Sequence, residues 1–356
     1  MFGGIYQNRR VLITGNTGFK GSILAWILHD LGADVQGYAL SPNTEPNNFD
    51  LLELPYDTDI ANVLDSFAMQ NVFNEFAPEI VFHLAAQPLV RCSYEQPVAT
   101  FSVNIQGTVN VLECCRLTPS VKAVAVITSD KCYRTGSPLP FTENSPLGGA
   151  DPYSASKACA EIVAESYRHS FINHDKLLAT CRAGNVIGGG DWAADRLMPD
   201  LMRNAADNKI TLLRNPAAVR PWQHVFEPLT GYLMLGEKLL AQHESFARAW
   251  NFGPDSGDAW PVAKMAEYAA KFWPQIKFDF ADAEFRRNQV AETDILRLDA
   301  QNAQQILQWR PVWTAAEAVQ YTTQWYRDFY TAQQLNTAED WQQYLLDAKK
   351  HHADWL

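Results

Sequence analysis

The feature that most constrains this chain is a glycine-rich turn between a short apolar run and an amphipathic stretch. Residues 11–14 (VLIT) precede Gly15, Gly18 and Gly21, and apolar residues then recur at helical spacing over 22–31. This is the order strand, turn, helix, in which glycines let the backbone approach a pyrophosphate whose charge meets the helix N-terminus. The turn therefore predicts a dinucleotide-binding unit, with a plain tight turn as the alternative.

The same alternation continues along the first half of the chain. Further strands are predicted at 35–40, 80–84, 123–128 and 177–182, and helices at 59–76, 98–117 and 154–171. Continuous apolar strands separated by amphipathic helices indicate a parallel sheet covered on both faces. We therefore predict a Rossmann-like, doubly wound α/β fold, which binds its ligands at the carboxyl ends of the strands.

The alternation breaks after about residue 185. Glycines at 188–190 and several prolines interrupt short, mixed elements, which is typical of a smaller domain built from insertions. The tail after Thr314 is predicted to be helical, and its aromatic side chains to pack in a core or against another subunit. We expect an NAD-binding domain of residues 1–184 plus about 222–252, and a mixed α/β C-terminal substrate-binding domain of about 185–221 plus 253–356.

Composition excludes several classes of function. With 29 Lys and Arg against 40 Asp and Glu, the formal net charge is −11 and no basic run stands out, which argues against nucleic acid or an anionic membrane surface as a partner. The 6 cysteines form no CxxC pair and no zinc-like spacing, so they are interpreted as reduced thiols, and no metal site is predicted. There is neither an apolar leader nor a run of about 18 apolar residues, which favours the cytoplasm.

A tyrosine and a lysine follow at the start of the predicted helix 154–171. Tyr153 and Lys157, in PYSASK, are four residues apart and share one helix face. A cation one turn away favours the phenolate, so a tyrosine with a reference pKa of about 10 can become a base near neutrality. Alone this pair is common on protein surfaces. Behind a dinucleotide-binding turn, and after an apolar strand that ends in TSDK (128–131), it becomes specific.

Several segments together carry a family resemblance. They are TGNTGFKGS (14–22), HLAAQPLVR (83–91), TSDKCY (128–133), PYSASK (152–157), RAGNVIGGGDW (182–192), RPWQHV (220–225) and WNFGP (250–254). The chain resembles the extended short-chain dehydrogenase/reductase family, and within it the nucleotide-sugar 4,6-dehydratases that act on CDP-D-glucose. The resemblance implies tightly bound NAD, a CDP-D-glucose substrate, a role in deoxysugar biosynthesis of the O-antigen or lipopolysaccharide type, and a homodimer or dimer of dimers formed through helices near 100–117 and 154–171.

The resemblance also implies a mechanism. Such enzymes oxidise C4 of the hexose by passing hydride to NAD, lose water across C5 and C6, and return the hydride to C6. In this chain Tyr153 would remove the proton of the C4 hydroxyl, Ser129 would orient that hydroxyl, and Lys157 would tune Tyr153 and hold the nicotinamide ribose. Asp130 would protonate the departing C6 hydroxyl, which requires a pKa raised by burial.

Position 131 separates subgroups of these dehydratases. Enzymes that act on dTDP-glucose carry Asp-Glu where this chain has Asp130 and Lys131, the pattern of the CDP-glucose enzymes. Lys131 would be the base at C5, for which desolvation and the nearby Lys157 would have to depress its pKa. The alternative is that Lys131 only pairs with Asp130 or with a substrate phosphate.

The remaining matched positions are expected to contact ligands. For NAD they are Gly15, Thr17, Gly18, Phe19, Lys20, Gly21, Asp59, Ile60, Leu84, Ala85, Ala86, Gln87 and Asn104, with Tyr153 and Lys157. For the nucleotide sugar they are Gln87, Arg91, Asn185, Asp191, Trp192, Arg196, Leu197, Arg220, His224 and Asn251. Arginines suit a pyrophosphate. The alternatives are a helix N-cap for Asp59 and ordinary packing for Trp192. Surface ion pairs or loop-closing hydrogen bonds are the alternative for Gln87, Arg91, Asn185, Arg196, Arg220 and Asn251.

The chain departs from the family pattern at three points. Asn16 stands where a histidine is expected, residues 56–59 lack the usual Gly-Asp-Ile-Arg-Asp form, and the segment after Tyr133 is shortened. The first two bear on adenine binding, and the third on the hexose pocket. The second strand also ends without Asp or Glu, so NAD is favoured over NADP only by the absence of a nearby cation.

Three rival functions remain. A nucleotide-sugar 4-epimerase shares the fold, the cofactor and the Tyr-x3-Lys pair but needs no acid and base for elimination, so Asp130 and Lys131 separate the two. A 4,6-dehydratase acting on another nucleotide sugar is the second rival. The third is a catalytically idle dinucleotide-binding protein, against which Tyr153 and Lys157 argue.

Overall fold

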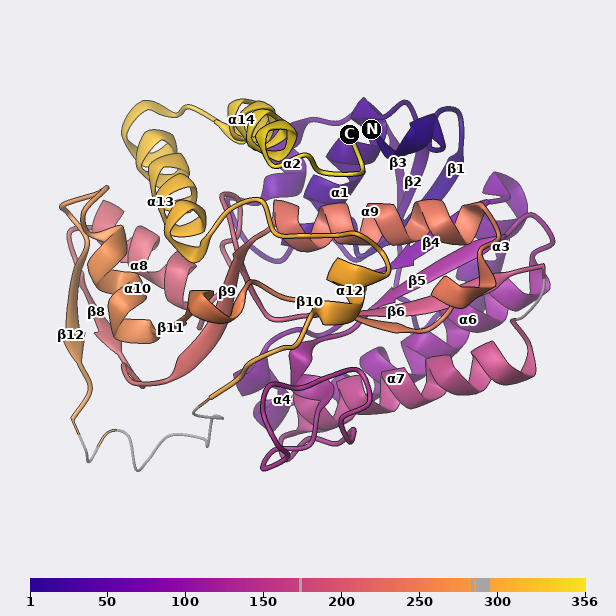
Figure 1. Ribbon diagram of the computed structural model, residues 1–356, viewed down its shortest axis with the longest axis horizontal. Helices are drawn as coiled ribbons and strands as arrows, with labels where there is room; N and C mark the ends of the chain where they lie inside the picture. Colours follow the sequence, from indigo (N-terminus) through magenta and orange to yellow (C-terminus); the bar gives the residue numbers. More distant parts are fainter. Residues whose placement is uncertain (173–174, 283–284, 286–294) are drawn as a thin grey trace.

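The computed structural model describes residues 1–172, 175–282, 285 and 295–356. Its larger lobe is built on a parallel sheet of seven strands in the order β10-β6-β5-β4-β1-β2-β3 (Figure 1). The strands are β1 (Arg10–Thr14), β2 (Asp34–Ala39), β3 (Asp57–Ile60), β4 (Ile80–His83), β5 (Ala123–Ile127), β6 (Leu177–Ala183) and β10 (Ala249–Phe252). The strand order reverses between β1 and β4, which is where such sheets bind ligands. The predicted Rossmann-like fold is confirmed.

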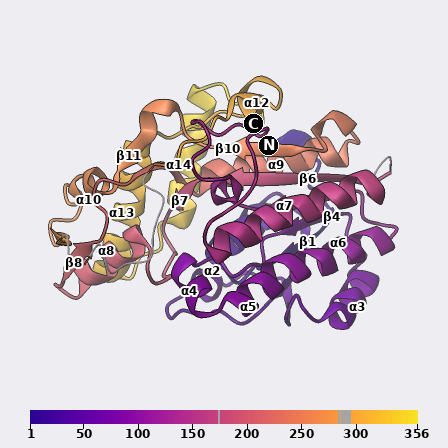
Figure 2. The same cartoon turned by 90° about the horizontal axis from the view of Figure 1, so that it is seen from below.

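Helices cover both faces of this sheet because successive strand residues point to opposite sides. Along β1, Val11 and Ile13 pack into one core and Leu12 into the other. The first face is covered by α1 (Phe19–Asp30) and α9 (Phe226–Leu240). The second is covered by α3 (Ser66–Phe76), α6 (Gly107–Leu117) and α7 (Pro152–Ser170), as Figure 2 shows.

The smaller lobe is a mixed structure of short elements. β7 (Asn185–Ile187), β9 (Val219–His224) and β11 (Ala259–Pro261) form one sheet, and β8 (Ile210–Leu213) pairs in parallel with β12 (Lys277–Phe280). The helices α8 (Leu197–Ala206), α10 (Val262–Ala269) and α13 (Ala315–Ala332) pack on them. Their core is rich in tryptophan, with Trp192, Trp222, Trp260, Trp273 and Trp325 all buried. The aromatic residues of α13 are thus part of a core.

The short elements complete the chain. They are α2 (Asn48–Leu52), α4 (Val90–Glu95), α5 (Pro97–Phe101), α12 (Gln301–Gln305), α14 (Thr337–Lys350), the π-helical turn η2 (Ser102–Gln106) and the 3-10 turns η1 (Phe2–Gly4), η3 (Asp130–Cys132), η4 (Glu244–Phe246) and η5 (Ser256–Asp258).

Four cysteines are buried and two are half-buried, and all six are free. Within the described ranges, no helix has the length and apolarity needed to cross a membrane.

The C-terminal part of the chain divides between the two lobes, whereas residues 253–356 were expected to belong to the smaller one. Trp309, Trp313, Trp341 and Tyr344 pack with α9 in the core of the larger lobe. The buried carboxylate of Glu227, on α9, accepts hydrogen bonds from the backbone N–H groups of Val312 and Trp313 and from the Tyr344 hydroxyl. The apolar side chains and these polar contacts together attach the tail to the large sheet.

The predicted helix 59–76 is wrong at its start. Residues 57–60 form β3, which pairs with β2 at the edge of the sheet, and α3 begins only at Ser66. The N-cap is Asp65, whose Oδ1 accepts a hydrogen bond of 2.9 Å from the N–H of Ala68. An edge strand needs no continuous apolar run, so the sequence DTDI gave no strand signal. Asp59 is therefore not a helix cap.

Candidate active site

A cavity of about 570 Å³ lies at the carboxyl ends of the large sheet's strands, between the two lobes. The larger lobe lines it with the turn after β1, the residues after β4, the residues after β5 and the N-terminal part of α7. The smaller lobe contributes residues 185–200 and 211–222 in part. Most predicted ligand contacts meet here: Gly15, Thr17, Gly18, Phe19, Lys20, Gly21, Leu84, Ala85, Ala86, Arg91, Ser129, Asp130, Lys131, Tyr153, Lys157, Asn185, Asp191, Trp192, Arg196, Leu197 and Arg220.

The glycine-rich turn is shaped for a close approach of its backbone to a ligand. Gly15 has φ +76°, and a Cβ there would lie 2.7 Å from the backbone nitrogen of Ala85. A Cβ on Gly21 would lie 2.1 Å from the carbonyl oxygen of Gly15, so this glycine lets α1 start against the turn. A Cβ on Gly18 would come within 4 Å only of that same oxygen, and Gly18 lines the cavity. The turn and the N-terminus of α1 therefore fit a pyrophosphate.

Two of the departures from the family pattern contact each other below this turn. The side-chain amide of Asn16 donates hydrogen bonds to the hydroxyls of Tyr56, at 3.2 Å, and Thr58, at 2.9 Å. Asn16 is fully buried. The residues at 16 and at 56–58 thus form one contact that joins the turn to β3.

The residues after β5 form a short turn that carries Asp130 and Lys131. The Ser129 hydroxyl donates to Asp130 Oδ1 at 3.0 Å and accepts from the N–H of Lys131 at 3.2 Å. Burial raises the pKa of Asp130, against the opposing effects of Lys131, Ser129, Arg220 and Lys20. This is the direction that a carboxylic acid acting near neutral pH requires.

Tyr153 and Lys157 both lie buried on the first turns of α7, which Asp151 caps through the N–H of Ser154. Lys157 Nζ donates to the carbonyl of Ile127 at 3.2 Å, and burial lowers its pKa to about 8. Burial raises the pKa of Tyr153 to about 12, opposed by a hydrogen bond with Ser129 and by the charge of Arg196. Arg196, from the other lobe, is thus a cation near Tyr153 that the spacing of Tyr153 and Lys157 does not reveal.

A buried ion pair supports the catalytic segment from below. Glu161, one turn after Lys157 on α7, contacts Arg182 of β6 at 2.6 Å and accepts hydrogen bonds from the hydroxyls of Thr128 and Thr180. It ties β5, β6 and α7 together where the residues after β5 begin. Sequence reasoning missed this pair, although a charged residue inside the buried strand LLATCRA was a usable signal.

Three predicted contacts hold the protein's own loops instead of lining the cavity. The Gln87 side chain bonds the backbone of Leu89 and the hydroxyl of Thr100. Asn104 bonds the backbone of Gln87 and the hydroxyl of Ser156. Asn251 accepts from the Tyr133 hydroxyl and donates to the carbonyls of Phe141 and Asp299. The alternative of loop-closing hydrogen bonds describes all three.

Three further predicted contacts also lie outside the cavity lining. Asp59 and Ile60 are in β3, where Asp59 accepts a bond of 2.8 Å from Gln36. His224 is buried between Phe226 and Trp313, and burial lowers its pKa to about 3, so its ring is neutral. The apolar residues around His224 assemble only in the folded chain.

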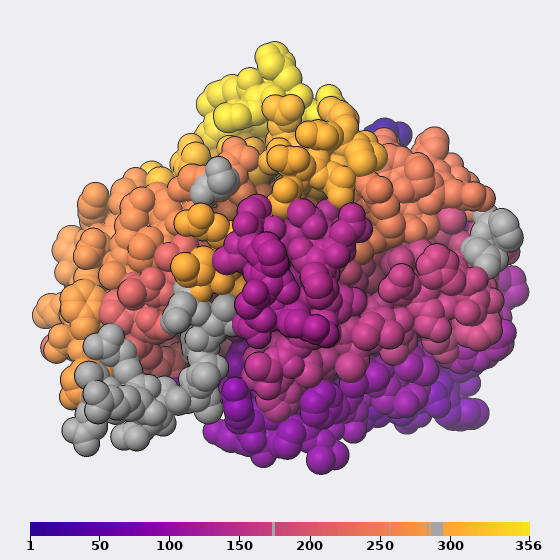
Figure 3. Space-filling view, turned by 60° about the horizontal axis from the view of Figure 1, so that its bottom comes forward, coloured from indigo at the N-terminus to yellow at the C-terminus, as the bar shows by residue number. Residues whose placement is uncertain are grey.

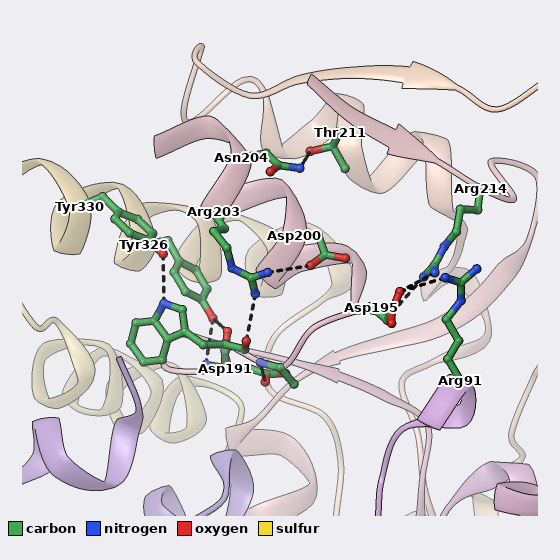
Figure 4. A network of polar contacts seen from close by, with 12 residues as sticks. Arg91, Asp191, Asp195, Asp200, Arg203, Asn204, Thr211, Arg214, Tyr326 and Tyr330 are labelled. Atoms are coloured by element: carbon green, nitrogen blue, oxygen red, sulfur yellow. Dashed lines mark hydrogen bonds and ion pairs between the residues drawn. The ribbon is translucent and has the colours of Figure 1, made fainter. Parts of the chain in front are cut away.

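The loop 191–196 of the smaller lobe is held by polar contacts of Asp191, some of which Figure 4 shows, and it carries Arg196 at the cavity. Asp191 bonds the Tyr326 hydroxyl through its backbone and contacts Arg196 at 2.8 Å. Trp192 is packed in the lobe's core and donates to the Tyr330 hydroxyl at 3.1 Å, which agrees with ordinary packing. The loop 191–196 is thus anchored on α13.

Comparison with known proteins places this geometry in a family. The family model described as GDP-mannose 4,6 dehydratase matches residues 12–322. A CDP-glucose 4,6-dehydratase of Salmonella typhimurium is 43% identical over 90% of this chain and 91% of its own. The solved structure of an epimerase from Methanothermobacter thermautotrophicus superimposes with a TM-score of 0.80 at 22% identity, covering 96% of each chain. A dTDP-glucose 4,6-dehydratase from Bacillus anthracis, solved with NAD, gives a TM-score of 0.74 at 21% identity, covering 90% of this chain and 97% of the other. The chain belongs to the GDP-mannose 4,6-dehydratase family.

Proposed function

We propose that this protein is a CDP-D-glucose 4,6-dehydratase, a lyase that converts CDP-D-glucose into CDP-4-keto-6-deoxy-D-glucose. The observation that carries the proposal is that Asp130 and Lys131 line the same cavity as Tyr153 and Lys157. Loss of water needs an acid and a base beside the residues that would assist the oxidation of C4 by NAD. The Salmonella typhimurium relative, a CDP-glucose 4,6-dehydratase, supports the same substrate.

NAD is the proposed cofactor. The open backbone at Gly18 and the N-terminus of α1 suit its pyrophosphate, and Lys157, which lines the same cavity, is assigned to its nicotinamide ribose. When bound, NAD supplies a hydride acceptor at C4 and a hydride donor at C6. The NAD complex of the Bacillus anthracis dehydratase, which has the same fold, supports this assignment.

Tyr153 is proposed to take the proton of the C4 hydroxyl, with Ser129 orienting that group. The pKa of about 12 makes Tyr153 a poor donor and a strong base once deprotonated, so its cationic neighbour Arg196 matters for forming the phenolate. Arg196 is itself held by Asp191. Through Arg196, the loop 191–196 of the smaller lobe is therefore proposed to support the base.

The elimination step is assigned to the two residues after Ser129. Asp130, whose pKa burial raises, would give its proton to the departing C6 hydroxyl. Lys131 would remove the C5 proton. It borders both the main cavity and a second cavity of about 180 Å³. Arg196 and Arg220 are assigned to the substrate's pyrophosphate.

The assembly is proposed to be a homodimer or dimer of dimers. The interface is proposed on the helices near 100–117 and 154–171. There α7 packs against α5 and α6 on the face seen in Figure 2, and Figure 3 shows α7 beside the magenta segment that precedes it. Val98 and Ile162 on these helices are 78% and 55% exposed, which supports an interface there. Size-exclusion chromatography with light scattering tests the oligomeric state, with Ile162→Glu as the variant that should disrupt the interface.

The cytoplasm is the proposed location of the protein, and deoxysugar biosynthesis is its proposed pathway.

The deciding experiment is mass spectrometry of CDP-glucose, dTDP-glucose, UDP-glucose and GDP-mannose, each incubated with the protein in heavy water. Loss of one water with deuterium gained at C5, from CDP-glucose alone, is the expected result. The same change from another sugar would reassign the substrate. Inversion at C4 without a change in mass would establish an epimerase, the activity of a Mycoplasma pneumoniae relative that is 24% identical over 90% of this chain.

A further inference from the structure

We propose that Asp195 is a positioning residue that holds Arg91 and Arg214, one from each lobe, at the rim of the cavity to bind the diphosphate of a nucleotide sugar. The inference deepens the proposed function, because it rests on that substrate class. Neither Asp195 nor Arg214 was expected from the sequence.

The three side chains form one bridge across the rim (Figure 4). Asp195 Oδ1 accepts from Arg214 Nη1 at 2.7 Å and from Arg91 Nη1 at 3.3 Å. Arg214 Nη2 also donates to the backbone carbonyl of Asp195 at 3.1 Å. Arg91 comes from α4 in the larger lobe, and Arg214 follows β8 in the smaller lobe. All three residues line the cavity.

The backbone of Asp195 is fixed for this task. Its φ is +63°, in the left-handed region, which aspartate adopts more readily than most non-glycine residues. The loop before it is held through Asp191 and Tyr326, and Arg203 donates to the carbonyl of Trp192. One side of the bridge is therefore rigid, and the guanidinium groups are oriented against it.

The exposure of the bridge shows that its main effect is on orientation. The Asp195 side chain is 43% exposed, and those of Arg91 and Arg214 are 30% and 28% exposed. Ion pairs this exposed add little to folding stability. Ordering two long side chains before a ligand arrives, however, improves affinity by about tenfold, since the ligand no longer bears that entropy cost.

The negative charge of Asp195 also repels an anionic ligand. This repulsion weakens binding, whereas the ordering of Arg91 and Arg214 strengthens it. At a solvated rim the repulsion is screened by water and salt. A guanidinium aimed at a phosphate makes charge-assisted, bidentate hydrogen bonds, which depend steeply on direction. Orientation therefore outweighs repulsion, and removal of Asp195 weakens binding.

The test is a double-mutant cycle on the intact protein with two readouts. One is the dissociation constant of CDP by titration calorimetry, and the other is KM and kcat for CDP-glucose. Asp195→Ala and Arg214→Ala should each weaken CDP binding and raise KM by about tenfold, with kcat changed less than about twofold. The loss of CDP affinity in the double variant should be smaller than the sum of the two single losses, because Asp195 acts partly through Arg214 and partly through Arg91.

Asp207→Ala is the matched control. Asp207 pairs with Lys209 at 2.7 Å in the same lobe and does not line the cavity, so its loss removes the same charge without touching the bridge. Unchanged or tighter CDP binding in Asp195→Ala, additive effects in the double variant, or no CDP binding to the wild type would each overturn the inference. Because CDP binding needs no turnover, a protein that binds CDP through the bridge but leaves CDP-glucose unreacted would contradict the proposed function alone.

Discussion

Replacing Glu161 by glutamine isolates the effect of burial on an ion pair. The protein offers a matched control, since Glu161–Arg182 and Glu113–Arg116 are both Glu–Arg pairs at 2.6 Å. The first pair has side chains only 2% and 5% exposed, whereas the second has 40% and 37%. Coulomb attraction at equal distance would predict similar losses on removing either carboxylate charge, so any difference comes from the surroundings.

The expected losses differ by several-fold. Breaking a buried pair typically costs about 3–5 kcal/mol because the remaining charge has no counter-ion. Thr128 and Thr180 donate to different oxygens of Glu161, so glutamine keeps an acceptor for one of these hydroxyls, and we expect about 3 kcal/mol for Glu161→Gln. For Glu113→Gln, an exposed pair three residues apart on α6, we expect about 0.4 kcal/mol.

Urea unfolding followed by circular dichroism and tryptophan fluorescence measures both losses. Burial raises the pKa of Glu161, but the charge of Arg182 and the hydrogen bonds it receives outweigh burial and hold the pKa below its usual range. Its contribution is therefore present above the unfolded carboxyl pKa of about 4.3 and is lost as the pH falls through the folded value. Equal losses for the two variants at pH 7, or a loss under about 1 kcal/mol for Glu161→Gln, would refute the reasoning.

Four further predictions concern the cavity and the tail. Tyr153→Phe should lower turnover by about a thousandfold, since no group then takes the C4 hydroxyl proton; a product assay that finds near-normal rates excludes this role. Lys131→Ala should stop after oxidation and accumulate reduced cofactor, visible by absorbance; full activity would remove Lys131 from the mechanism. Protein denatured after purification should release NAD or its reduced form, detected by chromatography, and a wholly empty protein that needs added cofactor at each turnover would count against tight binding. Burial raises the pKa of Glu227 to about 7, so the free energy of unfolding should fall by about 3 kcal/mol as the pH rises from about 4.5 to about 7. Glu227→Gln should remove this pH dependence of stability in urea titrations, and an unchanged pH dependence would contradict the assignment.

The sequence predicted most of the cavity because each contributing segment follows a recognisable strand. Gly15 after β1, Ala85 after β4 and Ser129 after β5 must meet once the strands are parallel neighbours. The edge strand β3 was missed because its residues DTDI carry no apolar run. The alternation of strands and helices thus predicts the sheet's centre better than its edge.

The contacts that sequence reasoning missed depend on long-range packing. Arg91 and Arg214 share Asp195 only because α4 and β8 come from different lobes that meet at the cavity. His224 resembled a ligand residue in the segment RPWQHV, but Phe226 and Trp313 enclose it. The pKa of Tyr153 depends on burial and on Arg196, and neither follows from the spacing of Tyr153 and Lys157.

The position of β10 affects the order in which the molecule can be built. This strand, residues 249–252, lies beside β6 at one edge of the large sheet, yet the chain forms β7, β8 and β9 before reaching it. A nascent chain that ends near residue 184 leaves β6 as an open edge, with unpaired backbone groups that invite pairing with other chains. Part of the smaller lobe must therefore be synthesised before β10 can pair with β6 and complete the sheet of the larger lobe. A fragment cut at residue 184 should therefore aggregate during synthesis.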